Sequence, residues 1–193
     1  MSVELVFETH SVTLDNERGI ATGWNDGRLS ERGRALAARL GERRRNDGVD
    51  GIFASDLGRA VETVEIAFAG SGIPVHFDAR LRECNYGEWN GMPVARLAAE
   101  RRRRIREPFP GGESYLDVVD RVAGFLADLA RDWEGRRVLL VGHSATRWAL
   151  DHLLAGVPLE DLVDAPFEWR EGWRFLLPSG WGRPLRHREP RRC

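Results

Sequence analysis

The chain has 193 residues, which suits one domain with or without a tail. Its net charge of -1 gives no global attraction to nucleic acid or to an anionic membrane, so any recognition of anions must be local. All 29 basic residues are arginines, which excludes lysine nucleophiles, Schiff bases and the lysine of a P-loop.

The two cysteines, Cys84 and Cys193, lie far apart and predict neither a disulfide framework nor a metal site. The first ten residues lack the basic and apolar regions of a signal peptide. No stretch approaches the roughly 18 apolar residues of a membrane span. We therefore expect a cytoplasmic protein with no membrane segment.

The first half of the chain alternates between apolar runs and amphipathic stretches. Residues 3–8 form a short apolar run rich in branched residues, which is typical of a strand. A polar stretch that contains glycine follows over 10–28, and loops of that length usually carry function. In chain order we then predict a helix over 31–45 capped by Ser30, a strand over 49–54, a helix from Ser55 or Asp56 to about Phe68, and a strand over 73–77.

The second half contains the clearest buried strand, RVLLV over 137–141. Residues 81–91 are loop-like, and the segment PFPGGES forbids a continuous helix before residue 114. The tail over 183–193 is charged and nearly free of apolar residues, so we predict one domain over 1–182 and a disordered tail. The remaining predictions are helices over 92–106, 114–133 and 145–155 and one or two strands within 169–177.

Strands that alternate with helices predict an α/β fold with a mainly parallel sheet. In such sheets ligands bind beyond the carboxyl ends of the strands. His10, the segment 55–59 and His143 each follow a predicted strand. We therefore expect these residues to meet at one rim of the sheet.

Four residues in that arrangement suit phosphoryl transfer to a protein nucleophile. A neutral imidazole, from His10 or His143, can attack phosphorus. The guanidinium of Arg59 can stabilise the charge on the phosphoryl oxygens. Glu83, in a loop that contains glycine, can protonate the leaving alkoxide. This set requires no metal, because the arginine and the second histidine supply the charge stabilisation.

Six segments, taken in order and at their spacing, resemble the histidine phosphatase superfamily, which includes the cofactor-dependent phosphoglycerate mutases. The first resembles the motif R-H-G-x-T-x-x-N and the third matches S-x-L-x-R-A-x-x-T. The resemblance covers roughly residues 3–177 and implies a three-layer α/β/α sandwich around a mainly parallel sheet. The segments are THSVTLDN (9–16), ATGWNDGRLSERG (21–33), SDLGRAVET (55–63), LRECNYGEWNG (81–91), FPGGES (109–114) and VLLVGHSA (138–145).

The resemblance implies a role for each matching residue. His10 would be the phosphorylated nucleophile, and Arg59 and His143 would bind and stabilise the phosphoryl group. Glu83 would act as the general acid and then as the base that activates water. The implied protein is a phosphomonoesterase without a metal or other cofactor that acts on a small phosphorylated substrate, is a monomer or homodimer, and has no nucleic-acid partner. Further substrate-binding candidates are Thr9, Ser11, Asn16, Thr22 and Gly23.

The chain departs from the family pattern on both sides of the nucleophile. Thr9 stands where the family has an arginine, and Ser11 stands where it has a glycine. Losing a preorganised donor typically costs about 2.7–4 kcal/mol of transition-state stabilisation. Hydroxyl groups replace that donor, another arginine does, the substrate brings its own charge, or the phosphatase activity is lower; the sequence does not choose among these. The candidates are the hydroxyls of Thr9, Ser11 and Thr13 and the side chains of Arg18, Arg28, Arg80, Arg82 and Arg147.

Three alternative functions compete with this interpretation. Mutases of the family carry extra sequence before the G-G-E-S segment that helps enclose their substrate, whereas the connection over 84–110 is short and offers only 92–106 as a partial lid. A degenerate phosphatase that binds a phosphorylated ligand or a protein partner is consistent with Thr9. A hydrolase elbow at Ser144 is disfavoured, because Thr146 replaces the last glycine of that motif.

Overall fold

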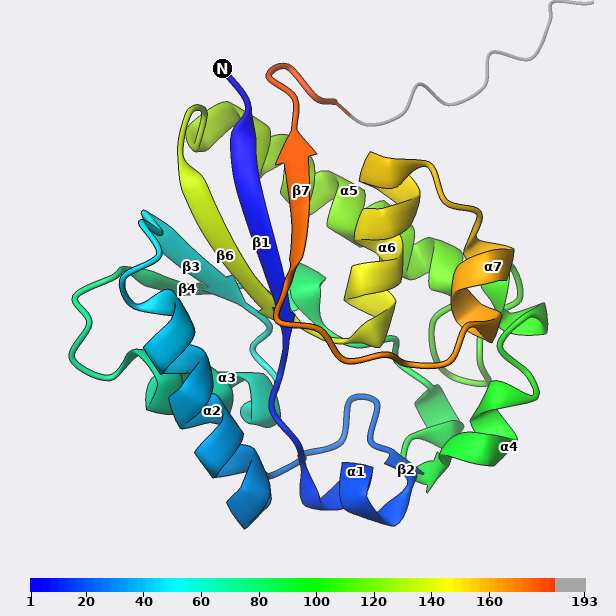
Figure 1. The fold of residues 1–193 in the computed structure, drawn as a ribbon. Helices are drawn as coiled ribbons and strands as arrows, with labels where there is room; N and C mark the ends of the chain where they lie inside the picture. The colour runs from blue at the N-terminus through cyan, green and yellow to red at the C-terminus, as the bar shows by residue number, and fades with distance from the viewer. Residues whose placement is uncertain (183–193) are drawn as a thin grey trace, which may run out of the picture.

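In a computed structural model of the protein, which describes residues 1–182, five strands form one sheet (Figure 1). The strands are β1 (Val3–Thr9), β3 (Gly51–Ala54), β4 (Val75–Phe77), β6 (Arg137–Gly142) and β7 (Trp173–Leu177). Their order across the sheet is β4-β3-β6-β1-β7, with the first four parallel and β7 antiparallel to β1. The predicted mainly parallel sheet is therefore confirmed, and the predicted tail lies outside the described residues.

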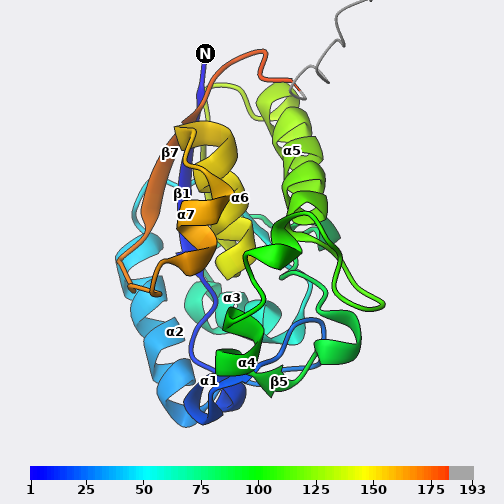
Figure 2. The same cartoon turned by 90° about the vertical axis from the view of Figure 1, so that its right-hand side faces the viewer.

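Helices cover both faces of the sheet, as Figures 1 and 2 show. One face carries α2 (Glu31–Arg44) and α3 (Gly58–Phe68). The other face carries α5 (Tyr115–Asp132) and α6 (Ser144–Ala155), with the short helix α7 (Leu159–Asp164) beside α6. This is the three-layer α/β/α arrangement that the family resemblance implies.

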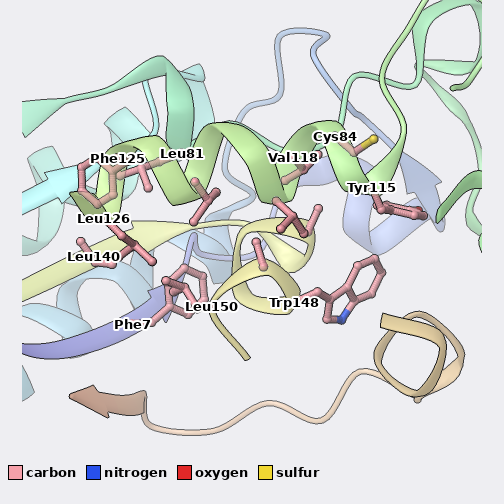
Figure 3. Packing of buried hydrophobic residues seen from close by; sticks show 14 of the residues in the cluster. Phe7, Leu81, Cys84, Tyr115, Val118, Phe125, Leu126, Leu140, Trp148 and Leu150 are labelled. Carbon is pink, nitrogen blue, oxygen red and sulfur yellow. The ribbon is translucent and has the colours of Figure 1, made fainter. Parts of the chain in front are cut away.

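The core lies on both sides of β6, because successive side chains of a strand point to opposite faces. Leu139 and Val141 pack in the cluster under α2 and α3, whereas Val138 and Leu140 pack in the cluster under α5 and α6. All four are completely buried, as expected for a central strand of a parallel sheet. Figure 3 shows part of the larger cluster, including Phe7, Phe125, Leu126, Trp148 and Leu150.

Short elements gather beyond the end at which the parallel strands finish (Figures 1 and 2). They are α1 (Leu14–Arg18), β2 (Ile20–Ala21), β5 (Met92–Pro93) and α4 (Val94–Ala98). β2 pairs antiparallel with β5, which ties the loop after β1 to the segment that precedes α4. The polar stretch over 10–28 thus has structure of its own. Single 3-10 turns lie at Ala79–Leu81, Gly87–Trp89 and Arg103–Ile105.

The predicted helix over 92–106 is wrong as a continuous element. Its first two residues form β5, so helix begins only at Val94 and α4 ends at Ala98. Four consecutive arginines follow over 101–104. In a continuous helix Arg101 would face Arg104 and Arg102 would face Arg106, and such pairs of like charge repel. The guanidinium of Arg104 instead turns inward, lying 5.3 Å from the ring centroids of both Trp89 and Phe109.

The predicted cap of α3 is also wrong, because the side chains of both candidate residues bond other partners. Neither Ser55 nor Asp56 caps the helix, which begins at Gly58 with Leu57 as an N-cap that makes no side-chain bond. The Ser55 hydroxyl bonds a histidine ring, and the Asp56 carboxylate pairs with Arg82. Both side chains are therefore engaged elsewhere.

Within residues 1–182 no helix combines the length and apolar character needed to cross a membrane.

Candidate active site

The two histidines that follow β1 and β6 lie side by side. The strands are parallel neighbours with Thr9 opposite Gly142, so the next residue of each chain segment leaves the sheet at the same level. The His10 N–H donates to the Gly142 carbonyl over 2.9 Å, and the imidazole centroids of His10 and His143 are 5.0 Å apart. The structure thus places both rings at one rim, as the sequence predicts.

The hydrogen bonding of His10 shows which of its ring nitrogens has a free lone pair. Its Nδ1 lies 2.7 Å from the Ser11 carbonyl, which can only accept, so Nδ1 carries the hydrogen. In the neutral ring the lone pair then belongs to Nε2. Burial of the ring, followed by the nearby charge of Arg59, lowers the pKa of His10 to about 3. The ring is therefore neutral near pH 7 and able to attack an electrophile.

His143 is 1% exposed and has one satisfied ring nitrogen. Its Nε2 lies 2.8 Å from the Ser55 hydroxyl, whereas Nδ1 is buried without a hydrogen-bond partner. Burial and then the charges of Arg59 and His10 hold the pKa of His143 well below its usual range. A buried polar atom without a hydrogen bond destabilises the folded state by about 1–3 kcal/mol. Such a cost is consistent with a nitrogen whose partner is a bound ligand.

Arg59 places a buried positive charge beside the two rings. It lies in the first turn of α3 and is 2% exposed. Its Nη2 donates to the Gly23 carbonyl over 2.8 Å and its Nη1 to the Asn25 carbonyl over 3.4 Å. Because a guanidinium has five N–H donors, others remain for a ligand. Burial lowers the pKa of Arg59, although the carboxylate of Glu83 opposes that effect.

Gly23 is required at this point of the loop. Its φ of +57° lies in the left-handed region, and a Cβ there would come 1.9 Å from the Asn90 side-chain oxygen. The same oxygen accepts the backbone N–H groups of Trp24 and Tyr86. The close approach therefore joins the loop after β2 to the loop after Glu83.

Glu83 is 8% exposed, and its carboxyl group is held through one oxygen. Its Oε1 accepts from the backbone N–H of Cys84 over 2.8 Å and of Ala145 over 3.2 Å. The second contact comes from the start of α6, next to His143. Within residues 1–182 no donor engages Oε2, which leaves that oxygen to carry or receive a proton.

An ion pair that was not predicted from the sequence fixes the backbone around Glu83. Arg121 on α5 donates to the carbonyls of Arg80 over 2.7 Å and Glu83 over 2.9 Å. The same guanidinium pairs with Glu113 over 2.9 Å, and Glu113 Oε2 accepts the Asn85 N–H over 2.8 Å. We call Glu113 and Arg121 the loop clamp. Only the position of Glu113 in the G-G-E-S segment hinted at its role.

The remaining predicted binding residues are distributed unevenly. Thr9 ends β1 and Ser11 is held by its N–H, which donates to the Thr63 hydroxyl over 3.0 Å. Asn16 is exposed, and its side-chain oxygen accepts the Thr13 N–H in the capping box of α1. Thr22 is buried and donates its hydroxyl proton to Asp15 over 2.8 Å. Asn16 thus has a structural use that the family resemblance does not reveal.

Most candidates for the missing guanidinium are engaged elsewhere. Arg80 pairs with two aspartates, Arg82 makes two 2.6 Å bonds to Asp56, and Arg147 pairs with Asp151 over 3.6 Å. The hydroxyl of Thr13 accepts the Asn16 N–H as the cap of α1. The other two arginines, Arg18 and Arg28, are exposed and make no ion pair within residues 1–182.

Together these residues provide a neutral nucleophile, a buried cation, an unpaired imidazole nitrogen and a carboxyl group. That combination can bind an anionic phosphoryl group, attack it, and exchange a proton with the leaving group. Among the described residues, no group of three or more histidine, cysteine or acidic side chains is arranged to hold a metal ion.

Known proteins resemble this chain in sequence and in fold. Residues 5–169 match the histidine phosphatase superfamily (branch 1). The probable phosphoglycerate mutase GpmB of Salmonella newport is 34% identical over 189 residues, spanning 89% of this chain and 86% of that protein. Bacillus stearothermophilus YhfR superposes with a TM-score of 0.80 at 29% identity, covering 93% of each chain. A mycobacterial glucosyl-3-phosphoglycerate phosphatase in complex with VO3 superposes with a TM-score of 0.72 at 32% identity, covering 83% of this chain and 85% of that one.

Proposed function

The chain belongs to the histidine phosphatase superfamily as a phosphatase, and from that premise we propose that it hydrolyses a small phosphorylated metabolite through a phosphohistidine at His10. The proposed reaction needs no metal ion. The observation that carries the proposal is the pairing of two neutral imidazoles 5.0 Å apart beside the buried guanidinium of Arg59.

The first step transfers the phosphoryl group to the protein. The lone pair of His10 Nε2 attacks phosphorus, an N–P bond forms, and the bond between phosphorus and the alcohol oxygen breaks. Arg59 and the unpaired Nδ1 of His143 stabilise the charge on the equatorial oxygens. The proton on Glu83 passes to the departing alcohol, which leaves as a neutral molecule.

The second step returns the protein to its starting state. Glu83, now ionised, accepts a proton from a water molecule while the oxygen of that water attacks phosphorus. The N–P bond breaks, the electron pair of that bond returns to His10 Nε2, and inorganic phosphate departs. The two backbone N–H groups on Oε1 leave Oε2 of Glu83 available for both proton transfers.

A hydrolase is preferred to a mutase because the segment that could cover the site, here called the cap, is small; it is the connection between Glu83 and α5. A mutase must keep water away from its phosphohistidine. The connection between Glu83 and α5 contributes only β5, α4 and two 3-10 turns, and Val94 and Arg96 on its surface are exposed. This small cap supports hydrolysis, although the relative from Salmonella is named as a probable mutase.

A degenerate phosphatase that only binds ligands is the second candidate, and Thr9 is the observation that favours it. Turnover of p-nitrophenyl phosphate by the wild type and by His10→Ala separates the two functions. We expect measurable activity that the substitution abolishes, undiminished by EDTA. We also expect Glu83→Gln to accumulate acid-labile phosphohistidine, detectable by intact-mass spectrometry. Equal background rates for wild type and His10→Ala would refute the enzyme.

A further inference from the structure

The charge of the active site is low for a pocket that must receive a phosphate dianion. Arg59 is the buried cation beside both imidazoles, and both rings are neutral near pH 7. The carboxylate of Asp15 acts on the same guanidinium, as does Glu83 in its ionised state. Thr9 contributes no charge where the family has an arginine. Within residues 1–182 a bound dianion therefore has one buried guanidinium beside the two rings, and the Asp15 carboxylate offsets part of that positive charge.

Asp15 is near enough to Arg59 for its charge to act on the guanidinium, and one short contact fixes its carboxylate. The carboxylate is half-buried, and its Oδ2 accepts the Thr22 hydroxyl over 2.8 Å. The next residue, Gly23, accepts from Arg59 over 2.8 Å. Within residues 1–182 no donor engages Oδ1 of Asp15. One oxygen thus fixes the carboxylate in place, and the other remains available to a ligand.

We propose that the substrate is a phosphomonoester that carries its own positively charged group a few bonds from the phosphate, such as an aminoalkyl phosphate. This inference rests on the proposed function. Asp15 binds the cationic group, while Arg59 and the two imidazoles hold the phosphoryl group. The cationic group of the substrate then supplies, near the phosphate, the positive charge that Thr9 lacks. The attraction between this group and Asp15 also offsets the repulsion between Asp15 and the phosphate.

The size of the effect follows from the worth of a charge-assisted hydrogen bond. Such bonds contribute about 1.5–3 kcal/mol, which corresponds to roughly 10- to 150-fold in a rate or binding constant. We therefore expect a preference of at least about tenfold in kcat/KM for a cationic substrate over a neutral one of the same length. A substrate with an added carboxylate should be poorer still.

Three phosphomonoesters of similar size test the inference: 2-aminoethyl phosphate, 2-hydroxyethyl phosphate and phosphoglycolate. The wild type should rank them in that order by kcat/KM at pH 7. Asp15→Asn, which keeps an oxygen for Thr22, should bring the ratio of the first two close to one. Thr9→Arg should raise kcat/KM for phosphoglycolate most, because it restores a fixed cation.

The outcomes separate this inference from the proposed function. If the amine and the alcohol are hydrolysed equally well, and His10→Ala is inactive on both, the enzyme stands and the cationic substrate is refuted. An unchanged ratio in Asp15→Asn would also refute it. If Arg28→Gln loses as much activity as Arg59→Ala, the protein supplies the missing charge itself and the inference is wrong. Inactivity on every phosphomonoester, p-nitrophenyl phosphate included, would instead refute the proposed function.

Discussion

Replacing Arg121 with lysine is expected to impair proton donation by Glu83 without unfolding the protein. The Arg121 guanidinium bonds the carbonyls of Arg80 and Glu83 at 2.7 and 2.9 Å and the Glu113 carboxylate at 2.9 Å. Glu113 in turn holds the Asn85 N–H. The loop clamp therefore fixes the backbone on both sides of the acid. A lysine keeps the charge but cannot reproduce the planar fork that reaches three partners.

The size of the loss follows from what the acid contributes. General acid catalysis supplies about 10²- to 10⁴-fold, and a misplacement of about 1 Å can cost roughly 100-fold. We expect Arg121→Lys to lower kcat/KM for glycerol phosphate by about 10- to 100-fold. p-Nitrophenyl phosphate should lose less than about threefold, because its phenolate departs without protonation. This parameter covers the steps through departure of the leaving group, so the later hydrolysis does not obscure the comparison.

A matched control is available in Arg103→Lys. Arg103 pairs with Glu107 at the surface, with side chains 60% and 50% exposed, and it contacts no residue of the Glu83 loop. That variant should behave as wild type with both substrates. Arg121→Lys is also expected to lower the free energy of unfolding by about 1–3 kcal/mol, which urea titration measures. Equal losses on both substrates, or none on either, would refute the positioning role of the clamp.

Other residues of the site give sharper tests of its electrostatics and geometry. The free energy of unfolding should fall as pH drops from about 6.5 toward 3, because the unfolded chain protonates His10 first; urea titrations should show His10→Gln removing up to about 1.4 kcal/mol per pH unit of that slope. Ser55→Ala should lower kcat/KM about tenfold, with a change in the imidazole ¹⁵N shifts of His143, because it removes the partner of Nε2; unchanged shifts would contradict this role. Gly23→Ala should destabilise the protein by at least about 1 kcal/mol more than Gly48→Ala in thermal unfolding, since both have positive φ but only Gly23 has a neighbour within 4 Å of its added Cβ.

Much of the fold could be predicted from local patterns. The run over 138–141 is apolar on both faces and forms most of β6, and the helical pattern over 114–133 corresponds to α5, although the capping box at Ser114 was not predicted. The least predictable segment was 92–106. Its helical pattern does not begin at residue 92, because Met92 pairs with Ala21 in a two-stranded sheet. α7 was missed as well, because its six residues follow Pro158 and are too short for a periodic signal.

The positions of His10, Arg59 and His143 follow from topology, since parallel strands bring their carboxyl ends to one rim. The residues that support them do not follow from topology. The clamp joins residues far apart in the chain, and Ser55 serves His143 across the sheet instead of capping the helix next to it. Such contacts depend on distances between side chains from separate elements, and no local pattern encodes those distances.

The loss of an arginine at position 9 affects phosphate binding more than it affects the nucleophile. Within residues 1–182 neither imidazole bonds a carboxylate, since His10 donates to a carbonyl and His143 bonds a hydroxyl. Burial is the main cause of the lowered pKa of both rings, and the charge of Arg59 adds to it. A second guanidinium would lower those pKa values further and would not change the neutral state at pH 7. With Thr9 at this position His10 is therefore still neutral at pH 7, and the remaining groups must neutralise the charge of the phosphate. Thr9→Arg should change the discrimination among substrates, while any acid limb of the pH profile that reports His10 should move only to lower pH.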